Sequence, residues 1–389
     1  MHILHVVRTL DPAAGGVIEC VRQMGLSSIQ DGHQVTVAAL DGGDEPWWTS
    51  FELPAIALGC GRGTYGYAAT ASNRLSAASS GADLVVADGL WQYQSRLVHR
   101  VCAGRIPYVV YPHGMLDPWF KRQYPLKHLK KYLYWLTAEY AVLRDAQAVV
   151  FTADDERLLA RESFRPYRVN EAVQAIGSAG AANDAEAIDR QRAAFAGICP
   201  EVADKPFILF LSRIHEKKGI DLLLTAFQRQ AAAHPQLELV VAGPDPDQLQ
   251  SRLMATVTDA EVAKRIHWPG MLRGDAKWGA FRAARGFCLP SHQENFGLVI
   301  AEALACGAPV LTTTQVNIWR EVVAAGAGLA VSDNAPAIGD MLGKFLALNA
   351  TEILIMGEQA MKLFQQTFAI ATAARARNQF FSKVIAHYA

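Results

Sequence analysis

The chain has 389 residues, 51% of them hydrophobic and 19% charged, and its 37 Lys and Arg residues balance 37 Asp and Glu residues. This length exceeds what one hydrophobic core usually organises, so we expect two domains, and the composition excludes a largely disordered protein. The even charge balance excludes a global field that would attract nucleic acid.

The six cysteines are scattered, with no Cys-x-x-Cys pair and no His cluster at metal-ligand spacing. We therefore expect reduced core thiols, no metal ion and no cofactor. The chain begins directly with a strand-like run, and no segment approaches the roughly 18 to 20 apolar residues that cross a bilayer. These features predict a cytoplasmic protein.

In the first half, short runs rich in Val and Ile alternate with helical segments such as 16–29 and 91–102, as in parallel βαβ units. The expected strands are His2–Val7, Gln34–Ala39, Asp83–Ala87, Pro107–Tyr111 and Ala148–Phe151. This pattern predicts an α/β, doubly wound domain over residues 1–170. Small residues blur the pattern over 171–205, where we place the linker.

The alternation restarts in the second half and predicts another doubly wound domain over 206–369. Its expected strands are Phe207–Ser212, Leu237–Ala242, Ile266–Trp268, Gly286–Leu289, Pro309–Thr312 and Leu329–Val331. Residues 370–389 are expected to form a helix that packs back on the first domain. Two such sheets would place the loops after their strands at the rims of a shared crevice.

The stretch from Ser291 to Val310 follows an expected strand and starts a helix near residues 295–297. Its first N–H groups and the positive end of the helix dipole would favour a phosphate. Glu294 precedes this helix and Glu302 lies eight residues later, about 12 Å along it at 1.5 Å per residue. The two acids can bracket an extended ligand, or they can be a capping carboxylate and an ordinary surface residue.

This stretch resembles the E-x7-E signature of the retaining family-4 glycosyltransferases, which have the GT-B fold of two Rossmann-like domains. The match includes both acids, the Phe-Gly pair and the Gly-x-Pro-Val continuation. The resemblance implies that Glu302 binds ribose hydroxyls and Glu294 the donor sugar. It also implies that Asn295, Phe296, Gly297 and Leu298 belong to the donor site.

Arg213 ends the strand that opens the second half, and Lys218 precedes a helix. Fixed cations there can stabilise a departing diphosphate, although two solvated loop cations would look the same in sequence. The block resembles the family's Arg-x4-Lys-Gly diphosphate motif. Lys217 is an adjacent cation that could exchange roles with Lys218.

In the first half, Gly15 and Gly16 lie between the first strand and the first helix, where glycine lets a phosphate approach the backbone. The resemblance carries this loop to the family's Gly-Gly-Val donor loop. It also implies that His113, after a strand, lines the donor sugar and acts in catalysis with Glu294, Arg213 and Lys218. Asp88 ends the preceding strand and is a further candidate on the acceptor side.

Gly270 and Met271 match the family's turn that edges the nucleobase, which we expect to be uracil. Asp245 and Asp247 follow a strand and Gly243-Pro244 without nearby carboxylates, so we interpret them as a turn and not as a metal site.

Residues 118–138 are basic and aromatic, with no acid before Glu139. Such a helix can lie peripherally on the inner face of an anionic membrane or hold a lipid-linked acceptor. It can equally be a domain helix with a solvated cationic face and an aromatic face in the core.

The sequence thus predicts a metal-independent, retaining hexosyltransferase that uses a UDP-sugar and a glycan or lipid-linked glycan acceptor, in exopolysaccharide or other cell-surface glycan assembly. A nucleotide-sugar epimerase on the same fold is the alternative. A nicotinamide dehydrogenase is disfavoured because residues 13–17 lack a G-x-G-x-x-G turn. The chain departs from the family at 175–180, where Pro-Asn-Gly is replaced by Ala-Ile-Gly-Ser-Ala-Gly.

Overall fold

The computed structural model describes residues 1–388, apart from the side chains of Phe120 and Arg122, and divides the chain into two compact units. The first unit comprises Met1–Gly177 and Ile370–Ala389, and the second comprises Ser178–Ala369. No helix among the described residues combines the length and the hydropathy needed to cross a membrane.

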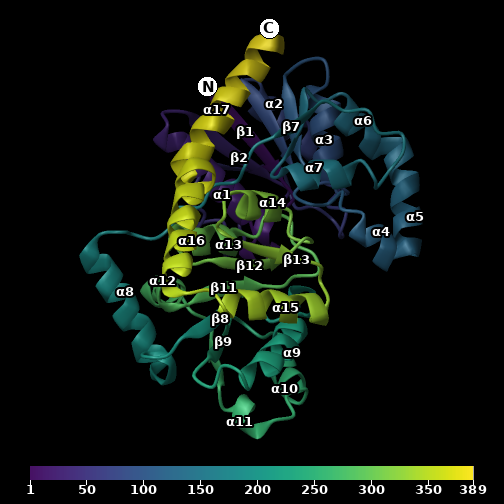
Figure 1. Ribbon diagram of the computed structural model, residues 1–389. Coiled ribbons are helices and arrows are strands. Elements are labelled where there is room, and N and C mark those ends of the chain that lie inside the picture. Colours follow the sequence, from purple (N-terminus) through teal and green to yellow (C-terminus); the bar gives the residue numbers. More distant parts are fainter. Residues whose placement is uncertain (389) are drawn as a thin grey trace. The chain divides into compact units, whose positions relative to one another are not determined.

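The first unit is built on a seven-stranded parallel sheet with the order β3-β2-β1-β4-β5-β6-β7 (Figure 1). The strands are β1 (His2–Val7), β2 (Gln34–Ala39), β3 (Ala55–Ala57), β4 (Leu84–Asp88), β5 (Tyr108–Tyr111), β6 (Ala148–Phe151) and β7 (Glu171–Val173). The helices are α1 (Gly16–Gln30), α2 (Ala71–Ser79), α3 (Tyr93–Cys102), α4 (Trp119–Gln123), α5 (Pro125–Tyr134), α6 (Tyr140–Arg144), α7 (Asp154–Ala160) and α17 (Ile370–Tyr388), with a 3-10 turn at Pro12–Ala14 and a π-helical segment at Trp135–Glu139.

Both faces of this sheet are covered, so its central strands are hydrophobic along their whole length. Alternate residues of β1 enter different cores: Leu4 and Val6 face one cluster, and Ile3 and Val7 face the other. Helix α17 contributes Phe381 to the second cluster. The C-terminal helix is therefore part of the first unit.

The second unit has a six-stranded parallel sheet with the order β10-β9-β8-β11-β12-β13. The strands are β8 (Phe207–Leu211), β9 (Glu238–Ala242), β10 (Ile266–Gly270), β11 (Gly286–Leu289), β12 (Val310–Thr313) and β13 (Gly328–Val331). The helices are α8 (Ala185–Ile198), α9 (Ile220–Ala231), α10 (Leu249–Met254), α11 (Ala260–Ala263), α12 (Gly274–Ala283), α13 (Leu298–Ala305), α14 (Trp319–Ala324), α15 (Ala335–Leu346) and α16 (Ala350–Leu363), with 3-10 turns at Pro200–Val202 and Glu216–Lys218 and a π-helical segment at Phe364–Phe368.

These two sheets confirm the predicted α/β class with two doubly wound, Rossmann-like parallel sheets. The strand order reverses between β1 and β4 in one unit and between β8 and β11 in the other. In folds of this kind, ligands bind beyond the carboxyl ends of the strands at that reversal. The loops after these four strands are therefore where each unit is expected to bind ligand.

The segment 171–205, expected as a linker, is largely structured. Residues 171–173 form β7, which pairs with β6 because its backbone completes the sheet edge. Residues 185–198 form α8, which packs along α12 in the second unit. The chain passes between the units at residues 177 and 178, and Gly177 is required there because a Cβ would lie 2.4 Å from the Cα of Ile370.

Candidate functional site

The loop after β11 forms the start of α13 in the second unit. The helix begins at Leu298, slightly later than the sequence suggested, because Gly297 adopts a left-handed backbone with φ of 69° and acts as the N-cap. The preceding loop is tied down by hydrogen bonds from the Glu294 N–H to Gln315 O (3.0 Å) and from the Asn317 N–H to Glu294 O (3.2 Å). In the first turn of α13 the Ile300 N–H donates to Gly297 O at 2.7 Å, and the N–H groups before it precede the first intrahelical acceptor.

Lys218 and Glu294, far apart in sequence, form an ion pair and a hydrogen bond in this unit. Lys218 lies at the end of the 3-10 turn Glu216–Lys218, and Gly219 follows with φ of 66°. A Cβ at Gly219 would lie 2.0 Å from the carbonyl oxygen of Pro290, so this close approach of two loops needs glycine. The approach places the ammonium of Lys218 directly beside the residues that precede α13.

Glu302 lies within α13, and its carboxylate accepts a hydrogen bond from Nζ of Lys277 at 2.8 Å. The same ammonium lies 4.0 Å from the ring centroid of Trp278. Sequence reasoning selected Glu302 but missed Lys277, which comes from α12. A bound ribose would have to share this carboxylate with a cation that is already present.

Arg213 follows β8, and its side chain is exposed. It has no hydrogen bond or ion pair with any residue that the structure describes, so its guanidinium remains available to a ligand. Its neighbourhood is tight: the Ile214 N–H donates to Pro244 O at 2.9 Å, and a Cβ at Gly243 would lie 1.8 Å from Ser212 O. The backbone below Arg213 is thus held in place while its side chain is not.

Gly270 ends β10, the edge strand next to β9, and Met271 follows it. The carbonyl oxygen of Gly270 accepts from the Gly243 N–H at 2.8 Å, and Gly270 has φ of 74° with open space where a Cβ would be. Met271 is exposed. This turn can receive a flat ligand against its backbone.

Phe296 is buried and contacts Phe368 edge-on, with ring centroids 5.5 Å apart. Asn295 accepts a hydrogen bond from the side-chain amide of Asn317 at 3.1 Å. Of these two motif residues, Phe296 therefore anchors the loop in the core of the second unit through its side chain.

In the first unit, Asp88 lies at the end of β4 with its carboxylate completely buried between two histidines. One oxygen accepts from Nδ1 of His5 at 2.8 Å, and the other accepts from Nε2 of His113 at 2.9 Å. Burial raises the pKa of Asp88, but the two histidines outweigh it and hold the pKa below its ordinary value. Both oxygens are hydrogen bonded within the protein, so Asp88 holds the ring of His113 in place, and its expected contact with an acceptor stays a prediction.

His113 has φ of 50°, and its ring stacks on Tyr111 with centroids 5.7 Å apart. The ring is thus fixed by stacking on one face and by Asp88 at Nε2. His5, which completes this trio, was missed because it lies inside the hydrophobic run of β1.

Gly15 is the N-cap of α1 and Gly16 is its first residue, and both are exposed. Asp11 accepts from the Ala13 N–H at 2.8 Å and so caps the short turn Pro12–Ala14. Gly15 has φ of 106°, and no atom lies within 4 Å of the place where a Cβ would be at either glycine. The loop therefore offers open backbone to a ligand.

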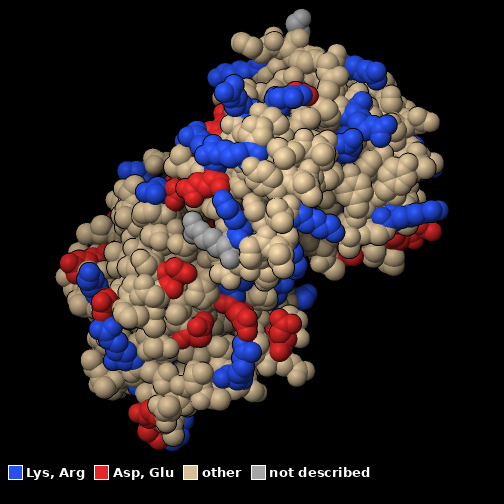
Figure 2. All heavy atoms as spheres, turned by 90° about the vertical axis from the view of Figure 1, so that its right-hand side faces the viewer, with Lys and Arg blue, Asp and Glu red and all other residues tan. Residues whose placement is uncertain are grey.

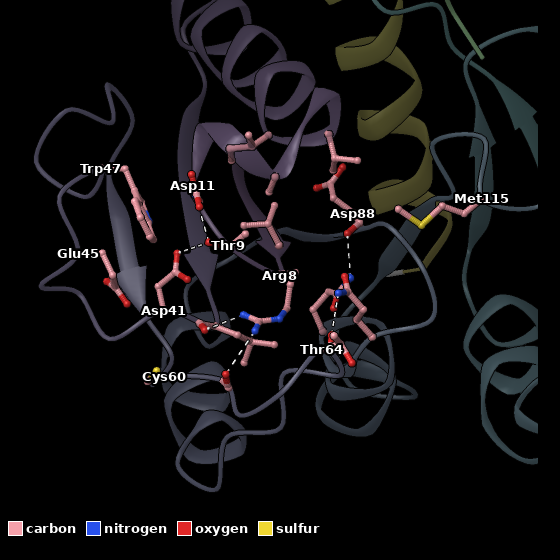
Figure 3. Close-up of a pocket in the computed structure, with 18 residues that line it drawn as sticks. Arg8, Thr9, Asp11, Asp41, Glu45, Trp47, Cys60, Thr64, Asp88 and Met115 are labelled. Atoms are coloured by element: carbon pink, nitrogen blue, oxygen red, sulfur yellow. Dashed lines mark hydrogen bonds between the residues drawn. The ribbon is translucent and has the colours of Figure 1, made fainter. Parts of the chain in front are cut away.

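A cavity of about 560 Å³ opens beyond the ends of β1, β2 and β4 in the first unit (Figure 3). Asp11, Asp41 and Glu45 bring carboxylates to its wall, and Arg8 is its cation. The Arg8 guanidinium donates to the carbonyl oxygens of Leu40, Gly61 and Gly63 at 3.1 to 3.3 Å, which the dashed lines in Figure 3 mark in part. Arg8 is therefore occupied with holding loops together.

Two polar atoms of the cavity wall are buried without a hydrogen-bond partner among the described residues: Nε1 of Trp47 and Oε1 of Gln94. Gln94 is almost fully buried, and its Nε2 donates to the backbone oxygen of Asp88 at 3.3 Å. Unsatisfied buried polar atoms are costly unless a ligand or water meets them. Sequence reasoning missed both residues because neither belongs to a recognisable motif.

One group of potential metal ligands exists among the described residues, formed by Cys199, Glu201 and His267. The spacing in sequence did not reveal it, since His267 comes from a different segment. Nε2 of His267 already contacts Glu238 at 2.8 Å, and burial raises the pKa of Cys199 to about 11. Both His267 and Glu238 lie at the amino ends of their strands, whereas Arg213 and Glu294 follow the carboxyl ends of theirs.

Asp245 accepts from the N–H groups of Leu249 and Gln250 at 2.8 and 2.9 Å. This carboxylate therefore shapes the turn before α10, as interpreted from the sequence.

Two family models match the chain, one in each unit. Residues 15–173 match "Glycosyl transferase 4-like domain", and residues 195–361 match "Glycosyl transferases group 1". Among curated proteins, a D-inositol 3-phosphate glycosyltransferase of Xylanimonas cellulosilytica is 36% identical over 149 residues, which are 37% of this chain and 34% of that protein. The chain thus aligns with about a third of the length of that relative.

Solved structures resemble the chain over nearly its full length. HepE of Anabaena in complex with UDP has a TM-score of 0.76 at 17% identity and covers 98% of this chain and 100% of its own. The sucrose-phosphate synthase of Thermosynechococcus elongatus has a TM-score of 0.73 at 20% identity and covers 99% of each chain. The chain therefore has the GT-B fold and belongs with the glycosyltransferases, its first unit carrying a Glycosyl transferase 4-like domain and its second a Glycosyl transferases group 1 domain.

Proposed function

We propose that this protein is a retaining, metal-independent hexosyltransferase that moves a sugar from a UDP-sugar to an acceptor hydroxyl. The observation that carries this proposal is the pairing of Lys218 with Glu294 beside the amino end of α13, with Arg213 exposed after the adjacent strand β8. Cations and free N–H groups at this reversal of strand order suit a diphosphate. HepE, a structural neighbour, has been solved with UDP-glucose.

The donor would be bound by Lys218 and Glu294, which form an ion pair in this structure. A diphosphate competes for the Lys218 ammonium, and the Glu294 carboxylate that it leaves can accept hydrogen bonds from sugar hydroxyls. Glu302 would bind the ribose, and the turn at Gly270 and Met271 would edge the base. As the glycosidic bond breaks, negative charge grows on the diphosphate, and the fixed cations stabilise it more than they stabilise the bound donor.

The first unit has its own candidate residues, His113, Gly15 and Gly16. Asp88 holds the His113 ring at Nε2, so the histidine presents a constant face to the sugar. In retention by front-side attack, the departing diphosphate oxygen takes the acceptor proton. No protein base is then needed, which agrees with the full engagement of Asp88 by two histidines.

The cavity of the first unit is the proposed acceptor site, and its chemistry favours an uncharged sugar. Its carboxylates would repel a phosphate, and its Arg8 is bound to three carbonyl oxygens. Trp47 and Gln92 give its wall an aromatic and an uncharged polar side chain. We therefore expect neutral glycosides to be better acceptors than their phosphates, unlike the substrate named for the inositol 3-phosphate relatives.

The setting that we propose is cell-surface glycan assembly, such as exopolysaccharide, on a glycan or lipid-linked glycan acceptor at the inner face of the membrane. The support is the surface of α5 in the first unit, which exposes leucines and lysines.

Donor binding tests this proposal directly. UDP and UDP-glucose are titrated calorimetrically into the wild type, into Arg213→Ala/Lys218→Ala and into Lys264→Ala. Lys264 is the matched control because it also pairs with a glutamate of the second unit, Glu261, but on an exposed surface. Loss of two charge-assisted hydrogen bonds should weaken binding by about 100-fold, whereas the control should bind normally.

Unchanged UDP affinity in the double variant would refute the donor site. A chelator should leave transfer from UDP-glucose unaffected, and loss of activity on chelation would contradict the metal-independent mechanism.

A further inference from the structure

Helix α5 of the first unit exposes a line of leucines, which we call the leucine stripe. Its members are Leu126, Leu129, Leu133 and Leu136, with exposed fractions of 84%, 63%, 64% and 53%. Residues three and four positions apart lie on one face of a helix, so the first three form a continuous ridge, and Leu136 extends it. Single exposed leucines are ordinary, but a row on one helix face marks an interaction surface.

The opposite face of α5 is partly buried, and the π-helical segment Trp135–Glu139 that follows it is packed in the core. Trp135 is completely buried and stacks on Phe164 with centroids 5.0 Å apart, and His128 stacks on Phe164 at 4.5 Å. The hydroxyl groups of Tyr134 and Tyr65 share a hydrogen bond of 2.8 Å. Of the residues considered for membrane contact from sequence, Trp135 is buried and Tyr134 is partly buried, whereas Tyr124 and the four leucines are exposed.

Lysines border the leucine stripe. Lys127 and Lys130 on α5 and Lys121 on α4 are exposed, and Nζ of Lys127 lies 4.8 Å from the ring centroid of Tyr124. Between Pro118 and Ala138 the sequence contains no Asp or Glu. Figure 2 looks onto the side that carries α4 and α5, and blue Lys and Arg spheres border the tan surface there. The side chains of Phe120 and Arg122 lie outside the described residues.

We propose that the leucine stripe and its lysines dock this protein on an anionic lipid bilayer. Leucines enter the boundary between headgroups and acyl chains, and the lysines pair with lipid phosphates, as in amphipathic helices that lie in the membrane plane. A second copy of the chain fits less well, because a two-fold contact through the same patch would bring the lysines of both copies together. This inference does not depend on the donor site.

Co-sedimentation with vesicles tests the proposal. The full-length protein is mixed with vesicles of phosphatidylcholine alone or of phosphatidylcholine with an equal part of phosphatidylglycerol, at low and at high salt. The wild type should sediment with the anionic vesicles, and high salt should release it, since attraction to an anionic surface is screened over about 10 Å at 0.1 M salt.

The key variant is Leu126→Gln/Leu129→Gln/Leu133→Gln, which keeps a good helix former at exposed positions. Its control is Leu354→Gln/Ile355→Gln, because these residues are similarly exposed on α16 of the second unit. The triple variant should lose at least 10-fold in vesicle affinity, and the control should bind like the wild type. Lys127→Gln/Lys130→Gln should lose about 5-fold per lysine, on anionic vesicles only.

Three results would overturn the inference. They are failure of the wild type to bind anionic vesicles, equal binding by the triple variant and the wild type, or dimerisation that the triple substitution abolishes. UDP titration of the same preparations separates the two proposals, since a failed membrane surface leaves donor affinity intact.

Discussion

Replacing Glu139 by glutamine should raise the free energy of unfolding of the first unit at neutral and higher pH, because it removes the cost of ionising a buried carboxyl group. Glu139 ends the π-helical segment Trp135–Glu139, and its side chain is fully buried. One oxygen accepts from the Trp91 N–H at 3.2 Å, and the other has no partner among the described residues. Burial raises the pKa of Glu139 to about 7, against the lowering effects of hydrogen bonds from Ser95 and Trp91 and of the charge on Lys131.

The magnitude follows from the difference in pKa between the folded and unfolded chain. Below the ordinary value of 4.5 the carboxyl is protonated in both states and has no effect on pH dependence. Between 4.5 and about 7 the unfolded chain releases this proton while the folded chain keeps it, so stability falls as pH rises. At 1.36 kcal/mol per pH unit, the total cost is about 3 kcal/mol above neutral pH.

Urea unfolding of wild type and Glu139→Gln, followed by tryptophan fluorescence, measures this cost. The variant should match the wild type near pH 5 and exceed its stability by about 2 to 3 kcal/mol near pH 8. Glu162→Gln is the control, because Glu162 is an exposed glutamate of the same unit. A stability difference that is the same at both pH values would refute the reasoning, since a neutral substitution effect has no such pH dependence.

Two further substitutions test how the site is held. Gly219→Ala should lower the free energy of unfolding of the second unit by about 3 kcal/mol or more and weaken UDP binding, because its Cβ would meet Pro290 O at 2.0 Å. Gly326→Ala is its control in urea unfolding: φ is 69° there too, but no atom lies within 4 Å, so the cost should be only about 1 kcal/mol. Asp88→Asn should lower the rate of transfer at least 10-fold and leave UDP affinity unchanged, because the amide cannot accept from both histidines. An active Asp88→Asn enzyme would show that His113 needs no fixed orientation.

The sequence alone was sufficient to predict the strands that are buried on both faces of a sheet. His2–Val7, Gln34–Ala39 and Ala148–Phe151 were predicted with the bounds that the structure has, because a short continuous apolar run is typical of a strand covered by helices on both sides. The strands β3 and β7 were missed. Each is three residues long and lies at a sheet edge, so its pairing with a neighbour, and not its own pattern, defines it.

The same distinction applies to the candidate site. Glu294, Gly297 and Lys218 could be predicted because each lies in a contiguous motif next to a strand end. His5 and Lys277 could not, since they meet Asp88 and Glu302 only through the packing of separate elements. The residue types of His5 and Lys277 do not by themselves indicate a site, because a histidine in a strand and a lysine on a helix are common. Contiguous motifs thus select candidate residues, whereas their hydrogen-bond partners on separate elements become visible only in the fold.

Both units share one strand order, yet the loops at the two reversals differ in chemistry. After β8 and β11 the chain places exposed Arg213, paired Lys218 and the amino end of a helix, all of which favour an anion. After β2 and β4 it places Asp41 and Asp88, whose carboxylates are buried and already hydrogen bonded. The same topology therefore carries loops of different chemistry in the two units. The loops of the second unit favour an anion, whereas the carboxylates beside the cavity of the first unit disfavour one.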